Sequence, residues 1–267
     1  MTYKLIATDL DDTLLDTDGK ISPLDKESII KAQEKGIKYV LASGRPTFAM
    51  QHLAKELELS KYQSYLISFN GAVIYNCNKK ITIFEDALSA SDAHLLYDFA
   101  KENMCEIITY LGDTIVSEDY NEFIQVELDI TKMPLIQVAN FKHFVQENVI
   151  KCILLAPPEH LAVMEEKLKE KYGSLYSIAR SKPFFLEVTR KGIDKGETLK
   201  RLCSLLNISL EECIAVGDSY NDITMLEAAG LAIAVANAKD AVKDVSDFIT
   251  LSHTQNGTKH FIEKFIL

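Results

Sequence analysis

Residues 4–13 read KLIATDLDDT, and this stretch decides the fold. The run Lys4–Thr8 is short and mostly apolar, and acidic residues follow it at once. An apolar run of this length that ends in a polar loop is typical of a strand buried on both faces. Asp9 and Asp11 are therefore expected in the loop at the end of an interior strand.

Helix and strand patterns alternate after this first strand. Ser22 and Pro23 are typical N-cap and first-turn residues of a helix through Lys35, and Gly36 marks its end. Apolar strands are predicted at Ile37–Ala42 and Tyr65–Ser68, with a helix between them. Alternating helices and apolar strands predict an α/β domain, with a Rossmann-like parallel sheet core and helices on both faces. Ligands of such sheets bind beyond the carboxyl ends of the strands.

The middle of the chain has a different pattern. Two strand-like runs flank Gly112-Asp113, which indicates a hairpin, and helices are interspersed with further strands. From Asp194 the first pattern returns, with an apolar strand at Cys213–Gly217. We therefore predict a discontinuous core domain interrupted by an inserted α+β cap domain. The predicted bounds are 1–81 and 189–267 for the core and 82–188 for the cap.

Composition limits the classes of partner. Hydrophobic residues make up 47% and charged residues 25%, as in globular proteins, and the formal net charge is -10. An acidic chain does not suit nucleic-acid or membrane binding, which depends on positive patches. The five cysteines form no C-x-x-C pair, so we expect reduced thiols and a cytoplasmic protein. We expect a small-molecule partner and a monomer or small homo-oligomer.

The acidic loop supplies two groups that phosphoryl transfer requires. One carboxylate of Asp9 and Asp11 can attack phosphorus and form an aspartyl phosphate. The other can donate a proton to the leaving oxygen and later accept one from water. The alternative is a solvated acidic loop, which is less favoured directly after a buried strand.

Three further motifs supply the remaining requirements. Ser43-Gly44 offers a hydroxyl and a backbone N–H to phosphate, although the serine could simply cap a helix. Lys195 can hold phosphate as a point charge, although a surface lysine at a helix start is the simpler interpretation. Asp218 and Asp222 offer oxygen ligands suited to Mg²⁺, although either could be a helix cap.

Taken in this order and spacing, the motifs resemble those of the haloacid dehalogenase-like hydrolase superfamily. The residues that carry the resemblance are DLDDT at 9–13, SGR at 43–45, DKG at 194–196 and GDSYND at 217–222. The long insertion between the second and third motifs is similar to the Cof-type branch with its C2-type cap. The resemblance extends over nearly the whole chain.

The resemblance implies a role for each matching residue. Asp9 would be the nucleophile and a Mg²⁺ ligand, and Asp11 the general acid/base and a ligand through its backbone carbonyl. Asp218 would be a direct metal ligand, with Asp222 supporting the metal and Thr13 steadying the loop. The residues that would contact phosphate are Leu10, Ser43, Gly44, Lys195 and Asn221.

Three places add to the family pattern or depart from it. Arg45 could reach the substrate or the cap, or could bridge to an acidic residue. Ser43 and Ser219 replace the Thr and Asn common in the family, without loss of the chemistry. The tail His253–Gly257 departs from the usual Asn-rich segment there, which concerns contacts on the substrate side.

Asp11 favours hydrolysis over other reactions of the superfamily. Ion-pumping ATPases carry Thr at this position, and dehalogenases lack the acid. The familiar sugar-phosphate mutase carries its cap soon after the first motif, and the segment between Thr13 and Ser43 is too short for it. We therefore expect a Mg²⁺-dependent phosphatase acting on small monoesters such as sugar phosphates, pyridoxal phosphate or flavin mononucleotide. A non-catalytic phosphate-binding module and a receiver-like signalling domain are the alternatives.

Overall fold

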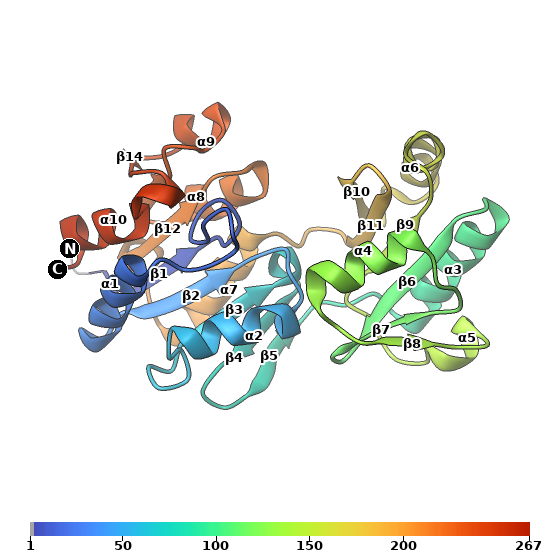
Figure 1. Cartoon of the computed structure of the whole chain (residues 1–267), viewed down its shortest axis with the longest axis horizontal. Coiled ribbons are helices and arrows are strands. Elements are labelled where there is room, and N and C mark those ends of the chain that lie inside the picture. The colour runs from blue at the N-terminus through green and yellow to red at the C-terminus, as the bar shows by residue number, and fades with distance from the viewer. Residues whose placement is uncertain (1–2) are drawn as a thin grey trace. The chain divides into compact units, whose positions relative to one another are not determined.

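The computed structural model describes residues 3–267, and the chain forms two compact units (Figure 1). The first unit contains the residues up to Phe84 together with Asp194–Leu267. The second unit is the continuous segment Glu85–Ile193. One unit is thus discontinuous in sequence and the other is inserted into it.

The first unit is built on an eight-stranded sheet in the order β14-β13-β12-β1-β2-β3-β4-β5. From β14 to β3 each strand is parallel to its neighbour, and β4 then pairs antiparallel with β3. The strands are β1 (Leu5–Thr8), β2 (Lys38–Ala42), β3 (Tyr65–Ser68), β4 (Val73–Asn76), β5 (Ile81–Glu85), β12 (Cys213–Gly217), β13 (Leu231–Ala234) and β14 (Phe248–Ile249).

Both faces of this sheet are covered. Every residue of β1, β3, β12 and β13 is buried, so neither face of these strands meets water. The α-helices of this unit are α1 (Pro23–Glu34), α2 (Thr47–Glu56), α7 (Lys195–Leu206), α8 (Ile223–Ala228), α9 (Asp240–Asp244) and α10 (Gly257–Phe265). The predicted α/β class with a parallel sheet is confirmed.

Local sequence explains where the helices begin and end. Ser22 caps α1 by accepting a hydrogen bond from the Asp25 N–H, and Pro23 fills the first turn. Gly36 follows this helix with φ of 91°, a left-handed conformation that suits glycine. Asp194 caps α7 through the Glu197 N–H and so sets Lys195 as the first helical residue.

The second unit contains a six-stranded sheet in the order β10-β11-β9-β6-β7-β8, antiparallel except for the pair β7–β8. Its strands are β6 (Glu106–Leu111), β7 (Thr114–Ser117), β8 (Leu135–Gln137), β9 (Cys152–Leu155), β10 (Tyr176–Lys182) and β11 (Phe185–Arg190). Its helices are α3 (Ala90–Glu102), α4 (Glu122–Thr131), α5 (Phe141–Phe144) and α6 (Pro158–Tyr172). The hairpin around Gly112-Asp113 is β6–β7.

The bounds of the two units differ slightly from the boundaries at 82 and 188 that the sequence predicts. Strand β5 at Ile81–Glu85 completes the first sheet beside β4, so most of it belongs to the first unit. At the other end, β11 continues to Arg190 in the second sheet. The boundary at 82 thus lies inside β5, and at the other end main-chain pairing continues β11 past its last apolar residue, Val188.

Two further features follow from the packing. All five cysteines are free and buried, as expected for reduced thiols that pack as small apolar groups. Between residues 3 and 267 no helix combines the length and the apolar character that a membrane crossing requires.

A buried polar pair in the second unit, Tyr110 with Glu127, is expected to make the stability of the fold depend on pH. Glu127 is buried and accepts a hydrogen bond from the Tyr110 hydroxyl at 2.5 Å. Burial raises the pKa of the Glu127 carboxyl above its ordinary value, against the opposing charge of Lys151. The folded state therefore holds this proton more tightly than the unfolded state, and stability falls as pH rises through the ordinary and then the raised pKa.

Glu127→Gln should remove this pH-dependent loss, because the amide oxygen still accepts from Tyr110 without carrying charge. We expect its gain in Tm over the unmodified protein to grow as pH rises above the ordinary glutamate pKa of about 4. Thermal unfolding at several pH values measures this, with Glu147→Gln as the control because Glu147 is exposed. A gain in Tm that is the same at every pH would contradict the assignment.

Candidate active site

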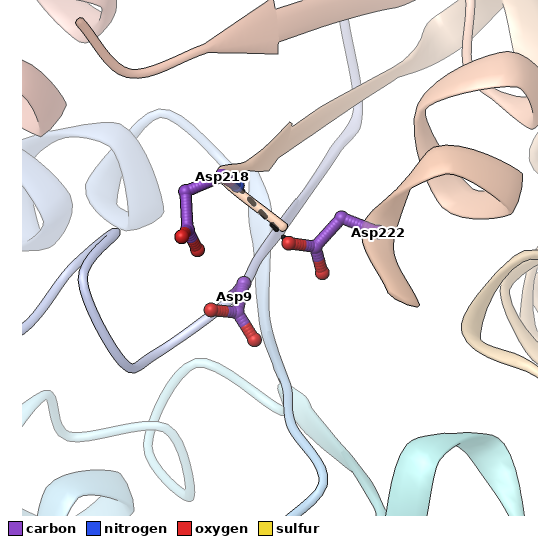
Figure 2. A group of neighbouring side chains, drawn as sticks. All are labelled: Asp9, Asp218 and Asp222. Carbon is purple, nitrogen blue, oxygen red and sulfur yellow. Dashed lines mark hydrogen bonds between the residues drawn. The ribbon is translucent and has the colours of Figure 1, made fainter. Parts of the chain in front are cut away.

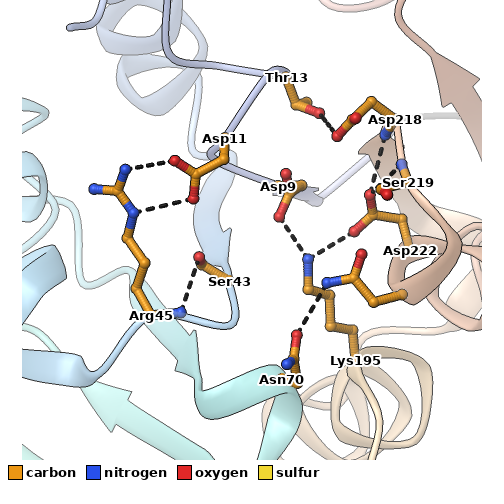
Figure 3. Close-up of polar contacts among 11 residues, drawn as sticks. Asp9, Asp11, Thr13, Ser43, Arg45, Asn70, Lys195, Asp218, Ser219 and Asp222 are labelled. Atoms are coloured by element: carbon orange, nitrogen blue, oxygen red, sulfur yellow. Dashed lines mark hydrogen bonds and ion pairs between the residues drawn. The ribbon is translucent and has the colours of Figure 1, made fainter. Parts of the chain in front are cut away.

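Three strand-end loops and the start of one helix of the first unit bring their polar residues together at one edge of the parallel sheet (Figure 3). Asp9 follows β1, Ser43 follows β2 and Asp218 follows β12, so each lies at the carboxyl end of its strand. Lys195 joins them from the start of α7. The strand-end position predicted from the sequence is therefore where these side chains meet.

Lys195 is the central cation of this group. Its side chain is fully buried, and its Nζ lies 2.5 Å from Asp9 Oδ1 and 2.7 Å from Asp222 Oδ1. Burial acts to lower the pKa of the lysine, but the two carboxylates outweigh it and raise that pKa above its usual range. A buried ammonium needs such partners, because desolvation alone costs several kcal/mol. The surface-lysine interpretation is wrong.

The loop after β12 is organised by Asp222. Its Oδ2 accepts the backbone N–H groups of Asp218 and Ser219, each at 3.0 Å, while its Oδ1 receives Lys195. A Cβ at Gly217 would lie 2.5 Å from the Asp222 Cβ, so the strand must end in glycine. Asp222 already accepts three donors and is suited to hold the loop rather than to bind a ligand of its own.

The three carboxylates form a compact group. Asp9, Asp218 and Asp222 each have an oxygen within 4.8 Å of the others, and all three are buried (Figure 2). Asp218 receives the Thr13 hydroxyl on Oδ1 at 2.9 Å, and Asp9 receives Lys195 on Oδ1. Each of these two residues thus keeps a second oxygen for a cation. Carboxylate oxygens in this arrangement fit a hard divalent ion.

The protein surroundings by themselves disfavour the charged forms of Asp9 and Asp218. Burial raises the pKa of Asp9 to about 8, against the opposing effect of Lys195, and Asp222 raises it further. Burial likewise raises the pKa of Asp218 to about 6, while its hydrogen bond from Thr13 acts in the opposite direction. A cation bound between these carboxylates would favour their charged forms and reverse these shifts.

Asp11 lies on the more open side of the loop and is paired with Arg45. The guanidinium is bidentate, with Nε 3.0 Å from Asp11 Oδ2 and Nη2 2.5 Å from Oδ1. The Arg45 N–H also donates to the Ser43 hydroxyl at 3.2 Å. Of the two expectations for Arg45, the bridge to an acidic residue is the one present in the structure.

The residues expected to contact phosphate lie around this centre. Ser43 is buried and is not the cap of α2, which begins at Thr47 after Pro46. Leu10 is buried, and its carbonyl accepts the backbone N–H groups of Leu14 and Leu15. Asn221 is exposed and donates from Nδ2 to Asn70 Oδ1 at 3.0 Å.

Sequence reasoning missed a second connection to the acidic loop. Asn237 donates from Nδ2 to the Asp12 carbonyl at 2.7 Å and accepts the His253 N–H at 3.1 Å. The divergent tail therefore reaches the loop that carries Asp9 and Asp11. One feature of the sequence could have indicated this contact: Asn237 is the first polar residue after the apolar strand β13.

The chain is similar to known proteins over nearly its whole length. The model of the haloacid dehalogenase-like hydrolase family matches residues 6–262. A solved haloacid dehalogenase-like hydrolase from Bacteroides thetaiotaomicron superposes with a TM-score of 0.94 at 36% identity, covering 98% of this chain and 99% of that one. The solved HAD subclass IIB sugar phosphatase BT4131 superposes with a TM-score of 0.79 at 25% identity, covering 98% of each chain.

Among curated relatives, the Bacillus subtilis 5-amino-6-(5-phospho-D-ribitylamino)uracil phosphatase YcsE is 30% identical over 264 residues, covering 99% of this chain and 96% of the relative. The chain belongs to the haloacid dehalogenase-like hydrolase family, in its Cof-type branch. It is a phosphatase, as the sequence predicted.

Proposed function

We propose that this phosphatase is Mg²⁺-dependent and hydrolyses small phosphate monoesters through a phosphoryl group carried on Asp9. The observation that carries the proposal is the buried Asp9 carboxylate, held by Lys195 on one oxygen and adjacent to Asp218. The arrangement offers a nucleophile, a fixed cation and a place for a divalent ion within one small volume.

In the first half of the reaction, Asp9 attacks the phosphorus atom of the ester. An O–P bond forms to the carboxylate, and the O–P bond to the leaving alcohol breaks. Asp11 donates a proton to the departing oxygen, and Lys195 holds the phosphoryl oxygens by charge. Asp9, Asp218 and the Asp11 carbonyl would hold Mg²⁺, which would supply charge neutralisation for the phosphoryl group.

In the second half, water attacks the phosphorus of the aspartyl phosphate. Asp11, now deprotonated, accepts a proton from the water as the new O–P bond forms. The bond between Asp9 and phosphorus breaks, which regenerates the carboxylate and leaves inorganic phosphate.

The proposed substrate is a small phosphorylated metabolite. One relative is named for a phosphorylated ribitylamino-uracil, and one solved neighbour is named a sugar phosphatase. Both names describe polar, hydroxyl-bearing leaving groups, and we extend that class to this enzyme. We also propose that the inserted unit selects the leaving group, that the enzyme acts in the cytoplasm, and that it needs neither nucleic acid nor a membrane.

Metal removal tests the cofactor. The purified protein should release phosphate from p-nitrophenyl phosphate in excess of enzyme when Mg²⁺ is present. EDTA should reduce the rate to background, because three buried carboxylates and one lysine leave excess negative charge facing the anionic substrate. Added Mg²⁺ should restore the rate.

The same assay separates this proposal from its alternatives. A phosphate-binding module and a receiver-like domain would release at most about one phosphate per protein molecule. Full turnover that persists in EDTA after exhaustive dialysis would contradict the magnesium assignment.

A further inference from the structure

Three consecutive residues of the first unit have a left-handed backbone. Phe69, Asn70 and Gly71 have φ of 52°, 55° and 106° in the turn that follows β3. This conformation is uncommon outside glycine and is unfavourable for a bulky residue such as Phe69. Such strain persists only where the surroundings fix it, so the contacts of this left-handed turn, Phe69–Gly71, indicate what it is for.

One set of contacts ties the left-handed turn to the loop after β2. The Phe69 N–H donates to the Arg45 carbonyl and the Asn70 N–H to the Ser43 carbonyl, each at 3.0 Å. A Cβ at Gly44 would lie 3.1 Å from both polar atoms of the Asn70 amide. The side chain of Asn70 therefore packs directly against the Ser43-Gly44 segment proposed to receive phosphate.

A second set of contacts ties the same turn to the start of α7. The Gly71 carbonyl accepts the Thr198 hydroxyl at 2.7 Å. A Cβ at Gly71 would lie 2.3 Å from the Asp194 carbonyl oxygen, so this position requires glycine. The left-handed turn is thus fixed on both sides, between the loop of Ser43 and the helix that presents Lys195.

The consequence of this fixation is the place of the Asn70 side chain. Its Oδ1 accepts the Nδ2 of Asn221 at 3.0 Å, and Figure 3 shows Asn70 among the polar groups around Asp9. The contact joins residues 151 positions apart in sequence. A side chain held by three left-handed residues is thereby aimed at the amide of Asn221.

We propose that Asn70 is a positioning residue that fixes the orientation of the Asn221 amide. A primary amide presents either a donor nitrogen or an acceptor oxygen, depending on rotation of its terminal group. Phosphoryl oxygens of a bound ester accept hydrogen bonds, so Asn221 must present nitrogen. In the structure Asn70 Oδ1 accepts from that nitrogen, and the contact stabilises the orientation in which Nδ2 of Asn221 also has a second N–H to donate to phosphate. This inference rests on the proposed function and on the proposed phosphate contact of Asn221.

A double-mutant cycle tests the inference. Asn70→Gly removes the amide but keeps a residue that adopts the left-handed backbone freely. We expect Asn70→Gly to weaken binding of inorganic phosphate in the presence of Mg²⁺ by about 3- to 10-fold, measured by calorimetry. Asn221→Ala should weaken it at least as much. The double variant should bind as Asn221→Ala does, because Asn70 acts through Asn221.

Controls and kinetics complete the experiment. Asn78→Gly, at an exposed turn, should leave phosphate binding unchanged, and thermal unfolding should show that each variant is folded. With p-nitrophenyl phosphate, Asn70→Gly should raise KM more than it lowers kcat. Normal phosphate binding in Asn70→Gly, an additive loss in the double variant, or normal binding in Asn221→Ala would each overturn the inference.

The two proposals fail in different ways. If the unmodified protein binds phosphate but hydrolyses no ester, the proposed function fails and the binding cycle still decides the role of Asn70. If it hydrolyses esters and Asn70→Gly matches it in both KM and phosphate affinity, only the role of Asn70 fails.

Discussion

Asp9→Asn is expected to reduce phosphatase turnover to background while the protein remains folded. The amide is close in shape to the carboxylate but cannot attack phosphorus, so no phosphoryl-enzyme can form. The fold should tolerate the change because Lys195 keeps its second partner, Asp222, at 2.7 Å. Loss of a covalent route is the largest effect a single substitution can have here.

Two measurements check this result. Steady-state phosphate release gives the turnover of Asp9→Asn, and its thermal unfolding in parallel shows whether the core survives. Mass spectrometry of the acid-quenched enzyme should find a phosphoryl adduct on the unmodified protein and none on the variant. Near-normal turnover in Asp9→Asn would show that another group is the nucleophile.

Asp11→Asn should give the second largest effect, a loss of about 10²- to 10⁴-fold in kcat. Asparagine neither donates a proton to the leaving oxygen nor accepts one from water, so both half-reactions slow. Asp11 lies outside the buried carboxylate group, and its side chain is 59% exposed. The substitution should therefore change stability little, even though it breaks the ion pair with Arg45.

The leaving group separates acid catalysis from a structural effect. p-Nitrophenolate leaves without a proton, whereas an alkoxide such as that of a sugar phosphate requires one. Asp11→Asn should therefore lose less activity in the first half-reaction on p-nitrophenyl phosphate than on a sugar phosphate, measured by single-turnover kinetics. Equal losses on both esters would contradict the role of Asp11 as general acid.

The sequence was sufficient where local physics dominates. The apolar runs of β1 and β12 are typical of interior strands, because a strand with no polar alternation needs cover on both faces. A polar residue directly after such a strand must lie at the carboxyl edge of a parallel sheet, so Asp9 and Asp218 could be placed together without coordinates. Helix α1 could be predicted equally well, because its N-cap Ser22 and the glycine that follows it, Gly36, are recognisable from neighbouring residues alone.

The second unit was less predictable. The sequence patterns did not identify helix α4 or strand β10. Which of their residues are buried depends on how these elements pack in the second unit. The predicted boundary at 188 lies inside β11 for a related reason, because main-chain pairing with β10 continues this strand to Arg190, beyond its apolar residues. Pairing partners are a property of the tertiary structure.

The sequence by itself determined the chemistry: carboxylates at strand ends, a lysine at a helix start and an insertion between the second and third motifs. Only the tertiary structure decided which partners these groups have. It buried Lys195 between Asp9 and Asp222, paired Asp11 with Arg45, and brought Asn70 to Asn221 across 151 positions. The reason is that strand periodicity and helix caps act over a few residues, whereas an ion pair or an amide contact depends on how distant loops converge at the sheet edge.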